Sequence, residues 1–243
     1  YLTNKNSDNN ISILEIGTWF GASALSWAQG LEEYANGKGN LTCVDAWVPF
    51  FNLEEHKEKE YVLEMEELLK SDFAYKVFLH NIGTVPESIT TQHFRGKSEN
   101  ILRFFKDDLF NVVFVDADHT YDFVKKDIIE SLRLVKENGI ICGDDLNMQM
   151  KDIDQEFAIN NKNKDFINDP KTSKNYHPGV TLAIEEIFGE VSSWGGFWAM
   201  QKINNQWKKI YLKNMPVVYP KHFDQDNINK ARSHFNDIKD NLE

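Results

Sequence analysis

The chain has few cysteines and no excess of positive charge. Its 243 residues include two cysteines, Cys43 and Cys142, each within a run of apolar residues, and its formal net charge is -11. The cysteines suggest neither a disulfide framework nor a thiolate zinc site, and we interpret them as small core residues. The negative charge predicts no nucleic-acid partner, because phosphate binding needs a basic face.

Long apolar runs are also absent. No run approaches the ~18 residues that a membrane-spanning helix needs, so no membrane partner is expected. The chain begins with Tyr1 rather than Met, which leaves a removed leader open, and the cytoplasm is the default expectation. With 41% hydrophobic and 13% aromatic residues the chain can bury a substantial core. Its length fits one decorated α/β domain or two small ones.

The stretch 110–146 organises the rest of the chain and reads FNVVFVDADHTYDFVKKDIIESLRLVKENGIICGDDL. Residues 112–115 are a short apolar run, which predicts a strand buried on both faces. An amphipathic helix is predicted next, because apolar residues recur every three or four positions, at Tyr121, Val124, Ile128, Leu132 and Val135. Gly139 stands where a helix C-cap is expected, and residues 140–143 predict a second strand.

Acidic side chains follow both of these strands. Asp116 and Asp118 end the first, and Asp144 and Asp145 end the second. Strands joined by a crossover helix lie parallel, so their carboxyl ends share the edge at which open α/β sheets bind ligands. So many like charges repel unless a cation lies among them, and oxygen ligands favour Mg²⁺ before Ca²⁺ or Mn²⁺.

A glycine turn follows the first predicted strand, residues 11–16 (ISILEI). The turn, GTWFGAS, leads into a helix, and this order opens a nucleotide-binding half-fold in which the helix N-terminus offers N–H groups to an anion. Trp19 stands where a dinucleotide fingerprint has its second glycine, which indicates a ligand without a pyrophosphate. Asp45 ends the second predicted strand, residues 40–44, where such folds bind a ribose diol; a turn cap is the alternative. Trp47 either covers an adenine ring or belongs to the core.

The remaining segments are less informative. Residues 49–72 predict an exposed, highly charged helix, and residues 73–82 a further helix with Phe73, Val77 and Phe78 inward. Residues 88–94 predict the third strand. Residues 147–177 are polar and irregular, which predicts a mobile lid or disorder. Two strands, residues 197–202 and 207–212, flank a hairpin turn, and the polar tail 215–243 has one weak helix, residues 228–242.

Taken together, the motifs resemble class I S-adenosylmethionine-dependent methyltransferases, specifically the metal-dependent O-methyltransferases. LEIGTWFGASALSWA looks like their first motif, VDAW like the second and RGKSENIL like the adenine-side GxSxxxL segment. VVFVDADHTYDFVKKD with LVKENGIICGDDL looks like the metal-carrying half, so that the resemblance spans residues 11–146. The sequence DADH followed by DD looks closest to bacterial small-molecule and sugar O-methyltransferases. Catechol-type and caffeoyl-type enzymes have similar motifs.

The resemblance implies a single domain over residues 1–243. Its fold would be α/β, with a Rossmann-like doubly wound, mostly parallel seven-stranded sheet that ends in an antiparallel C-terminal hairpin strand. Residues 11–146 would form the cofactor and metal core, 49–72 and 147–179 insertions over the active site, and 213–243 a C-terminal extension.

The resemblance also implies the site residues. Ser23 would hold the methionine carboxylate of S-adenosylmethionine and Asp45 its ribose, within a cofactor pocket formed by Glu15, Gly17, Gly21, Ser23, Asp45, Trp47, Ser98, Glu99 and Asp116. Mg²⁺, or else Mn²⁺ or Ca²⁺, would bind Asp116, Asp144 and Asp145; the catechol type has an amide at the last position. His119 falls where relatives place a general base, whereas some branches use an acid at the Asp118 position, and the choice stays open. His177 is a weaker substrate-side candidate.

The chemistry implied is methyl transfer to a hydroxyl of a small molecule. The acceptor, whether sugar, natural product or phenol, stays open, as does a homo-oligomer. An NAD-dependent oxidoreductase would share the first half, but Trp19 disfavours it and it does not explain Asp144 and Asp145. A metal-dependent hydrolase would have only the acidic cluster in common with the predicted site. A non-catalytic S-adenosylmethionine-binding module would keep the cofactor pocket and lose the metal.

Overall fold

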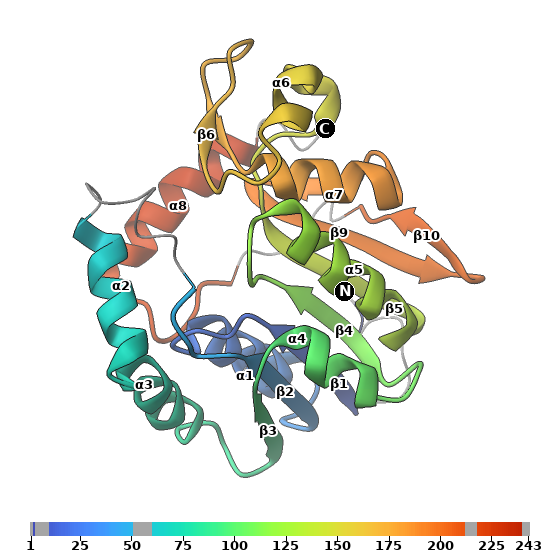
Figure 1. Cartoon of the computed structure of the whole chain (residues 1–243). Helices are drawn as coiled ribbons and strands as arrows, with labels where there is room; N and C mark the ends of the chain where they lie inside the picture. The colour runs from blue at the N-terminus through green and yellow to red at the C-terminus, as the bar shows by residue number, and fades with distance from the viewer. Residues whose placement is uncertain (1, 3–9, 51–59, 212–217, 240–243) are drawn as a thin grey trace.

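A mixed β-sheet forms the centre of the molecule (Figure 1). The computed structural model describes residues 2, 10–50, 60–211 and 218–239. Within them the strand order is β3-β2-β1-β4-β5-β9-β10, with β8 paired to β9. The first five strands are parallel, whereas β9 runs antiparallel to β5, β8 and β10. This confirms the predicted Rossmann-like sheet and its C-terminal hairpin, and adds the short strand β8. The bounds are β1 Ile11–Ile16, β2 Gly39–Asp45, β3 Ile89–Arg95, β4 Phe110–Val115, β5 Val135–Leu146, β8 Ser192–Trp194, β9 Gly196–Ile203 and β10 Gln206–Lys209.

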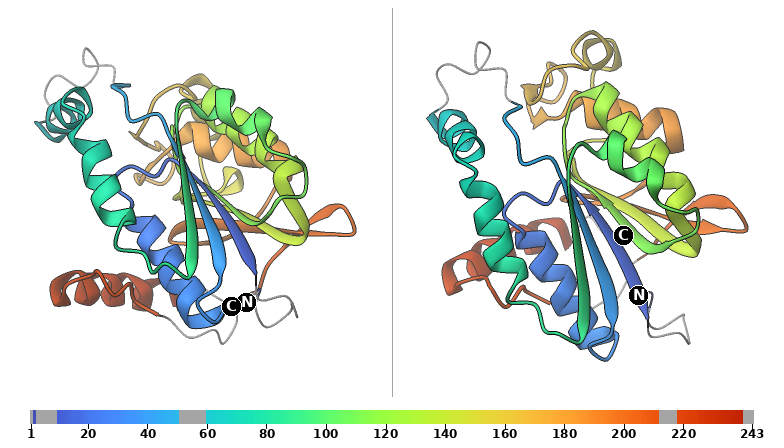
Figure 2. Two further views of the ribbon diagram at one scale, coloured as in Figure 1. Left: turned by 90° about the horizontal axis from the view of Figure 1, so that it is seen from below. Right: turned by 60° about the horizontal axis from the view of Figure 1, so that its bottom comes forward.

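Helices cover both faces of the sheet (Figure 2). Alternate residues of β4 explain this, because successive side chains of a strand point to opposite faces. Val113 belongs to the core cluster that contains Ile128 of α5, and Phe114 to the cluster that contains Ala28 of α1. The helices are α1 Ala22–Tyr34, α2 Glu60–Lys70, α3 Phe73–Ile82, α4 Ser98–Ile101, α5 Tyr121–Leu134, α6 Gln155–Asn160, α7 Pro178–Phe188 and α8 Gln225–Lys239, with the 3₁₀ turns η1 Leu102–Phe104 and η2 Met150–Asp152.

The end of α5 differs from the prediction. The helix stops at Leu134, and Val135 already has extended backbone and pairs with Phe110. Gly139 is therefore not a helix cap. It lies in the irregular part of the β4–β5 pairing, where a Cβ would approach the carbonyl oxygen of Asn111 to 2.9 Å. Leu132 lies in α5 and packs against the core as predicted, whereas Val135 belongs to the sheet.

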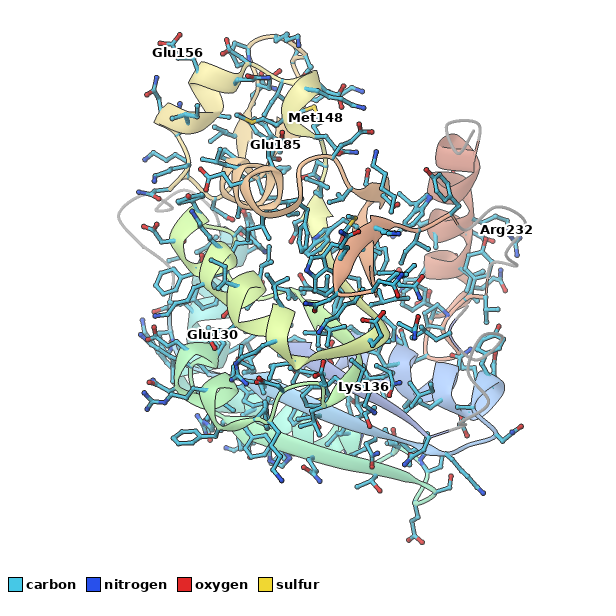
Figure 3. The ribbon with its side chains drawn as sticks, turned by 90° about the vertical axis from the view of Figure 1, so that its right-hand side faces the viewer. Glu130, Lys136, Met148, Glu156, Glu185 and Arg232 are labelled. Carbon is cyan, nitrogen blue, oxygen red and sulfur yellow. The ribbon has the colours of Figure 1, made fainter. Side chains whose placement is uncertain are left out.

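Residues 147–179 contain regular elements, so the expectation of a structureless loop is wrong. Besides η2 and α6 they contain the hairpin β6 Ile167–Asn168 with β7 Asn175–Tyr176. Tyr176 is fully buried, and the buried carboxylate of Asp169 accepts the amide hydrogens of Asp154 at 2.9 Å and Thr172 at 2.7 Å. These bonds fix the turn in the absence of a regular sequence pattern. Figure 3 shows this region at the top of the molecule, with Glu156 of α6 pointing away from it.

The other insertion and the tail follow the predictions in part. Within residues 49–72 the structure has α2, and residues 51–59 lie outside the described part of the chain. In α3 Phe78 is buried as predicted, but Phe73 is 52% exposed, because Ala74 takes the inward position. The weak C-terminal helix is α8, which lies on the side of α1 (Figures 1 and 2). No helix among the described residues is long and apolar enough to cross a bilayer.

Candidate active site

The glycine turn after β1 lies against the end of β4. Gly17 has φ +88° and its amide donates to the carbonyl of Val44 at 2.9 Å. A Cβ on Gly17 would lie 1.9 Å from the carbonyl oxygen of Asp116, so no other residue fits without a backbone shift. Gly21, with φ +87°, is the N-cap of α1, and no side chain caps this helix. The first amides of α1 are thus available to an anionic group.

A buried carboxylate lies beneath this turn. Glu15 is fully buried at the end of β1, and its Oε1 accepts the hydroxyl hydrogen of Ser23. Burial raises the pKa of Glu15 to about 8; the bond from Ser23 opposes the shift, and the charge of Asp116 adds to it. Glu15 and Ser23 were both predicted for the cofactor pocket, and the structure brings them together directly.

Asp45 lies next to the same turn. Its Oδ2 accepts the amide hydrogen of Trp19 at 2.8 Å and its Oδ1 that of Trp47 at 2.7 Å. Burial raises the pKa of Asp45, and these backbone bonds lower it in part. The carboxylate therefore caps two turns, as the alternative for this residue stated. The backbone amides of Thr18 and Ala46 also hydrogen-bond to this carboxylate.

Trp47 differs from its predicted cofactor role. Its side chain is 1% exposed, its ring lies 4.6 Å from that of Phe78, and its Nε1 donates to the carbonyl of Trp19 at 2.7 Å. The indole has no exposed face that could cover an adenine ring. Trp47 is thus a core residue that holds the glycine turn against α3.

Ser98 and Glu99 start α4, beyond the end of β3. Both are partly exposed, and Glu99 forms an ion pair with Lys126 of α5. Ser98 hydrogen-bonds to Asp127, whose pKa burial raises to about 6. The pair lies at the same edge of the sheet as Asp45, because the amide of Gly96 donates to the carbonyl of Asp45 at 2.8 Å.

The carboxylates after β4 and β5 converge as predicted. Val115 pairs with Gly143 in the parallel ladder, which places Asp116 beside Asp144 and Asp145. Burial raises the pKa of Asp116 to about 7, with further contributions from the charges of Asp145 and Asp144. Burial is thus the main cause of the shift, and the two neighbouring carboxylates add to it.

The carboxylates of Asp144 and Asp145 make different contacts. Oδ1 of Asp144 accepts the amide hydrogen of Asp145 at 2.9 Å, and Asp145 has φ +65°. Among the described residues, Asp116, His119 and Asp145 form a group whose ligand atoms lie within 4.8 Å of one another. Asp144 is outside this group, in contrast to the predicted trio, because its carboxylate caps the turn. Asp144 and the three residues of this group all line one small cavity of about 10 Å³, which has room for about one water or ion.

His119 lies between two carboxylates. Its Nε2 is 2.9 Å from Oδ2 of Asp145, and its Nδ1 is 2.7 Å from Oδ1 of Asp165. Burial alone would lower the pKa of His119, but the hydrogen bonds to Asp145 and Asp165 outweigh it and raise the pKa to about 10. Without a cation the imidazole is therefore protonated at neutral pH. A divalent ion at Asp145 would oppose that proton and restore a neutral, basic ring.

Asp118, the other candidate base, caps the start of α5. Its Oδ1 accepts from both the amide and the hydroxyl of Thr120, at 2.7 and 2.6 Å. Because both bonds use Oδ1, Oδ2 of Asp118 is left to accept a proton from a substrate. The structure therefore keeps both candidates at the site, with His119 in contact with Asp145.

Two side chains from residues 147–179 complete the site. Asp165, which the sequence analysis missed, reaches His119 from 46 positions away, and no local pattern signals this contact. His177, expected only as a substrate-side residue, has its Nε2 3.6 Å from Oδ1 of Asp145 and its ring centroid 4.4 Å from that of His119. This segment thus forms one wall of the site.

Comparison with known proteins identifies the family. Residues 14–146, more than half of the chain, match the family described as methyltransferase domain, and the chain belongs to this family. The protein is an S-adenosylmethionine-dependent methyltransferase, and its Rossmann-like sheet and glycine turn fit that class. No curated protein sequence matches the chain.

Several solved structures are similar to parts of this chain. An S-adenosylmethionine-dependent methyltransferase from Methanosarcina mazei is 15% identical, with a TM-score of 0.47 over 83% of this chain and 96% of the other. An O-methyltransferase from Bacillus cereus in complex with SAH is 20% identical, with a TM-score of 0.43 over 80% and 76%. The YcgJ protein from Bacillus subtilis is 21% identical, with a TM-score of 0.32 over 58% of this chain, which spans 47% of that protein. Similarity at this level does not bear on substrate or mechanism.

Proposed function

We propose that this methyltransferase is divalent-metal-dependent and transfers the methyl group to a hydroxyl oxygen of a small molecule such as a sugar, a natural product or a phenol. The main support is the group of Asp116, His119 and Asp145 at the carboxyl ends of β4 and β5. It lies next to the glycine turn, because Gly17 touches the carbonyl of Asp116. A metal-bound hydroxyl and a sulfonium methyl would thus be neighbours.

The donor set fits a hard dication. Two carboxylates with a third, Asp144, nearby provide oxygen ligands and negative charge, and the charges of Asp145 and Asp144 add to the effect of burial in raising the pKa of Asp116. Mg²⁺ bound there would lower the pKa of a coordinated hydroxyl and orient it. Asp116 and Asp145 would hold the ion, and Asp144 would keep the turn of Asp145 in place.

The cofactor residues also fit. The amides at the uncapped N-terminus of α1, that of Ser23 among them, suit the methionine carboxylate, and Asp45 suits the ribose hydroxyls. Ser98 and Glu99 are proposed for the adenine side. S-adenosylmethionine supplies an electrophilic methyl group on a sulfonium sulfur. Because Trp47 is buried, another residue must cover the adenine ring.

The protein's own groups would handle the proton. The acceptor oxygen gains the methyl group, the sulfur keeps the electron pair of the broken C–S bond and leaves as a neutral thioether, and Nε2 of a neutral His119 would take the hydroxyl hydrogen. Asp118 is the second candidate, through its free oxygen. Alignment of the acceptor and the methyl group is expected to supply much of the rate.

Calorimetric titration of S-adenosylmethionine and of NAD, each with and without Mg²⁺, tests the cofactor assignment. S-adenosylmethionine is expected to bind and NAD is not. A mass-spectrometric screen of hydroxyl compounds for a mass gain of one methylene then identifies an acceptor. Methylation should stop with EDTA or in Asp145→Asn, and should persist in Asp152→Asn, which alters an exposed acid of η2. Methyl transfer that survives chelation would reject the metal requirement.

A further inference from the structure

We propose a second cation site in this protein, formed by His119, Asp165 and His177, for a transition-metal dication such as Zn²⁺ or Co²⁺. The ligand atoms of these three residues lie within 4.8 Å of one another. The site uses the opposite edge of the His119 ring from the group with Asp116 and Asp145. The proposal goes beyond the methyl-transfer function and does not depend on it.

The imidazole rings of His119 and His177 have the same orientation with respect to the two neighbouring carboxylates. The Nε2 atoms of His119 and His177 face Asp145, at 2.9 and 3.6 Å. Their Nδ1 atoms face Oδ1 of Asp165, at 2.7 and 3.3 Å. Two nitrogen atoms and one carboxylate oxygen thus lie close together, from the loop between β4 and α5 (His119) and from segment 147–179 (Asp165 and His177, the N-cap of α7).

One of these donors is unsatisfied. Within the described chain, Nδ1 of His177 is buried and has no hydrogen-bond partner, although Asp165 lies 3.3 Å away, and the residue as a whole is 8% exposed. A buried polar atom without a partner is costly, and its orientation toward Asp165 and His119 points to a missing ligand. A cation among the three groups would satisfy it.

The spacing suits coordination. Donors ~2.0–2.2 Å from a tetrahedral ion stand roughly 3.3 Å apart, which is the distance from Asp165 to His177. The shorter Asp165–His119 contact would lengthen by about half an ångström as the ion replaces the hydrogen-bonded proton. Three protein ligands leave one position for water.

The donor types select the ion. Two imidazoles and one carboxylate suit Zn²⁺, Co²⁺ and related ions, whereas the all-oxygen neighbours Asp116, Asp144 and Asp145 suit Mg²⁺. The two positions would therefore bind ions of different classes.

The backbone around the site is closely packed, so the donors are held in place. A Cβ on Gly179 would lie 2.4 Å from the carbonyl oxygen of His119, and the amide of Tyr121 donates to the carbonyl of Lys162 at 3.1 Å. His177 and Asp165 are thus fixed on both sides of the loop that carries His119. A bound ion would fasten residues 147–179 over the catalytic edge and fix the orientation of the His119 ring.

The test uses Co²⁺ as the probe, because its visible absorption reports coordination. Co²⁺ is titrated into the full-length variant Asp116→Asn in excess Mg²⁺. The substitution weakens the proposed magnesium site at Asp116 and Asp145, and the excess Mg²⁺ fills what remains of it. We expect one equivalent to bind. Adding Asp165→Asn or His177→Ala should weaken binding more than ~100-fold, whereas the control His80→Ala, on exposed α3, should leave it unchanged.

Asp165→Asn preserves the size of the side chain and decides the matter if His177→Ala does not fold, which circular dichroism would show. Loss of Co²⁺ binding in Asp116→Asn itself would overturn the proposal, because the ion would then occupy only the first position. Unchanged binding in both double variants would also overturn it. Failure to find a methyl acceptor would leave the titration unaffected and would count against the proposed function alone.

Discussion

Gly17 and Asp116 are in such close contact that a Cβ on Gly17 would stand 1.9 Å from the carbonyl oxygen of Asp116. The turn that is proposed to bind S-adenosylmethionine therefore rests on the residue that is proposed to bind the metal. Neither half of the site can move without the other. This contact joins strands β1 and β4, which are neighbours in the sheet.

Gly17→Ala should destabilise the protein and abolish cofactor binding. Left-handed backbone costs a non-glycine residue ~1–2 kcal/mol, and forced overlap typically adds ~1–3 kcal/mol. We expect a loss of about 3 kcal/mol in urea denaturation. The control is Gly30→Ala in α1, where a Cβ meets nothing within 4 Å and should be neutral or stabilising. Equal effects of the two substitutions would contradict the close contact.

Stability should fall with rising pH because of Glu15. Its pKa is raised to about 8 by burial, so between the ordinary carboxyl pKa and about 8 the folded chain holds a proton that the unfolded chain has lost. The stabilisation is complete below the unfolded pKa and is lost as the pH rises through the folded one. Glu15→Gln should remove the part of the slope that Glu15 contributes, while Asp116 and His119, whose pKa values are also raised, keep theirs. It should raise stability at pH 8 by about 2–4 kcal/mol.

Urea titrations of metal-free protein from pH 4 to 9 would measure this slope. The matched control is Glu87→Gln, an exposed position at which the slope should remain as in the wild type. A slope in Glu15→Gln as steep as that of the wild type would show that Glu15 does not contribute to the pH dependence.

The sequence could predict the core because its signals are local. The apolar run of β4 and the acids after β4 and β5 need only the rule that parallel strands end at one edge, and the structure places Asp116 and Asp145 together there. Segment 147–179 could not be predicted in this way. Its fold depends on Asp169, which accepts the amide hydrogens of Thr172 in its own turn and of Asp154 15 positions away, and on the burial of Tyr176 within a polar sequence.

Long-range contacts also explain the errors in single residues. Asp165 meets His119 only because the segment folds back over α5, and Trp47 is buried only because α3 covers it. Gly139 looked like a cap because the sequence cannot show that Val135 pairs with Phe110. In each case a tertiary partner decides the conformation.

Asp145 and Asp144 should differ in their effect on the metal. Asp145 belongs to the compact group with Asp116, whereas Asp144 caps the amide of Asp145, a bond that an asparagine oxygen can also accept. Asp145→Asn should weaken Mg²⁺ binding more than about tenfold, and Asp144→Asn by only a few-fold. Calorimetric titration of Mg²⁺ into each variant measures both. A larger loss in Asp144→Asn would mean that Asp144 turns to bind the ion, as the sequence alone suggests.

Mg²⁺ should also change the protonation of His119. In the metal-free chain, bonds to Asp145 and Asp165 overcome the effect of burial and raise its pKa to about 10. A dication at Asp145 takes that carboxylate and repels the imidazolium, so the pKa of His119 should fall toward neutrality, where the ring can act as a base. NMR titration of the histidine ring protons, with His119→Gln to assign the signal and exposed His80 as the internal control, would follow both states. If saturating Mg²⁺ left the titration of His119 unchanged, the ion would lie elsewhere, and Asp118 would become the better candidate for the base.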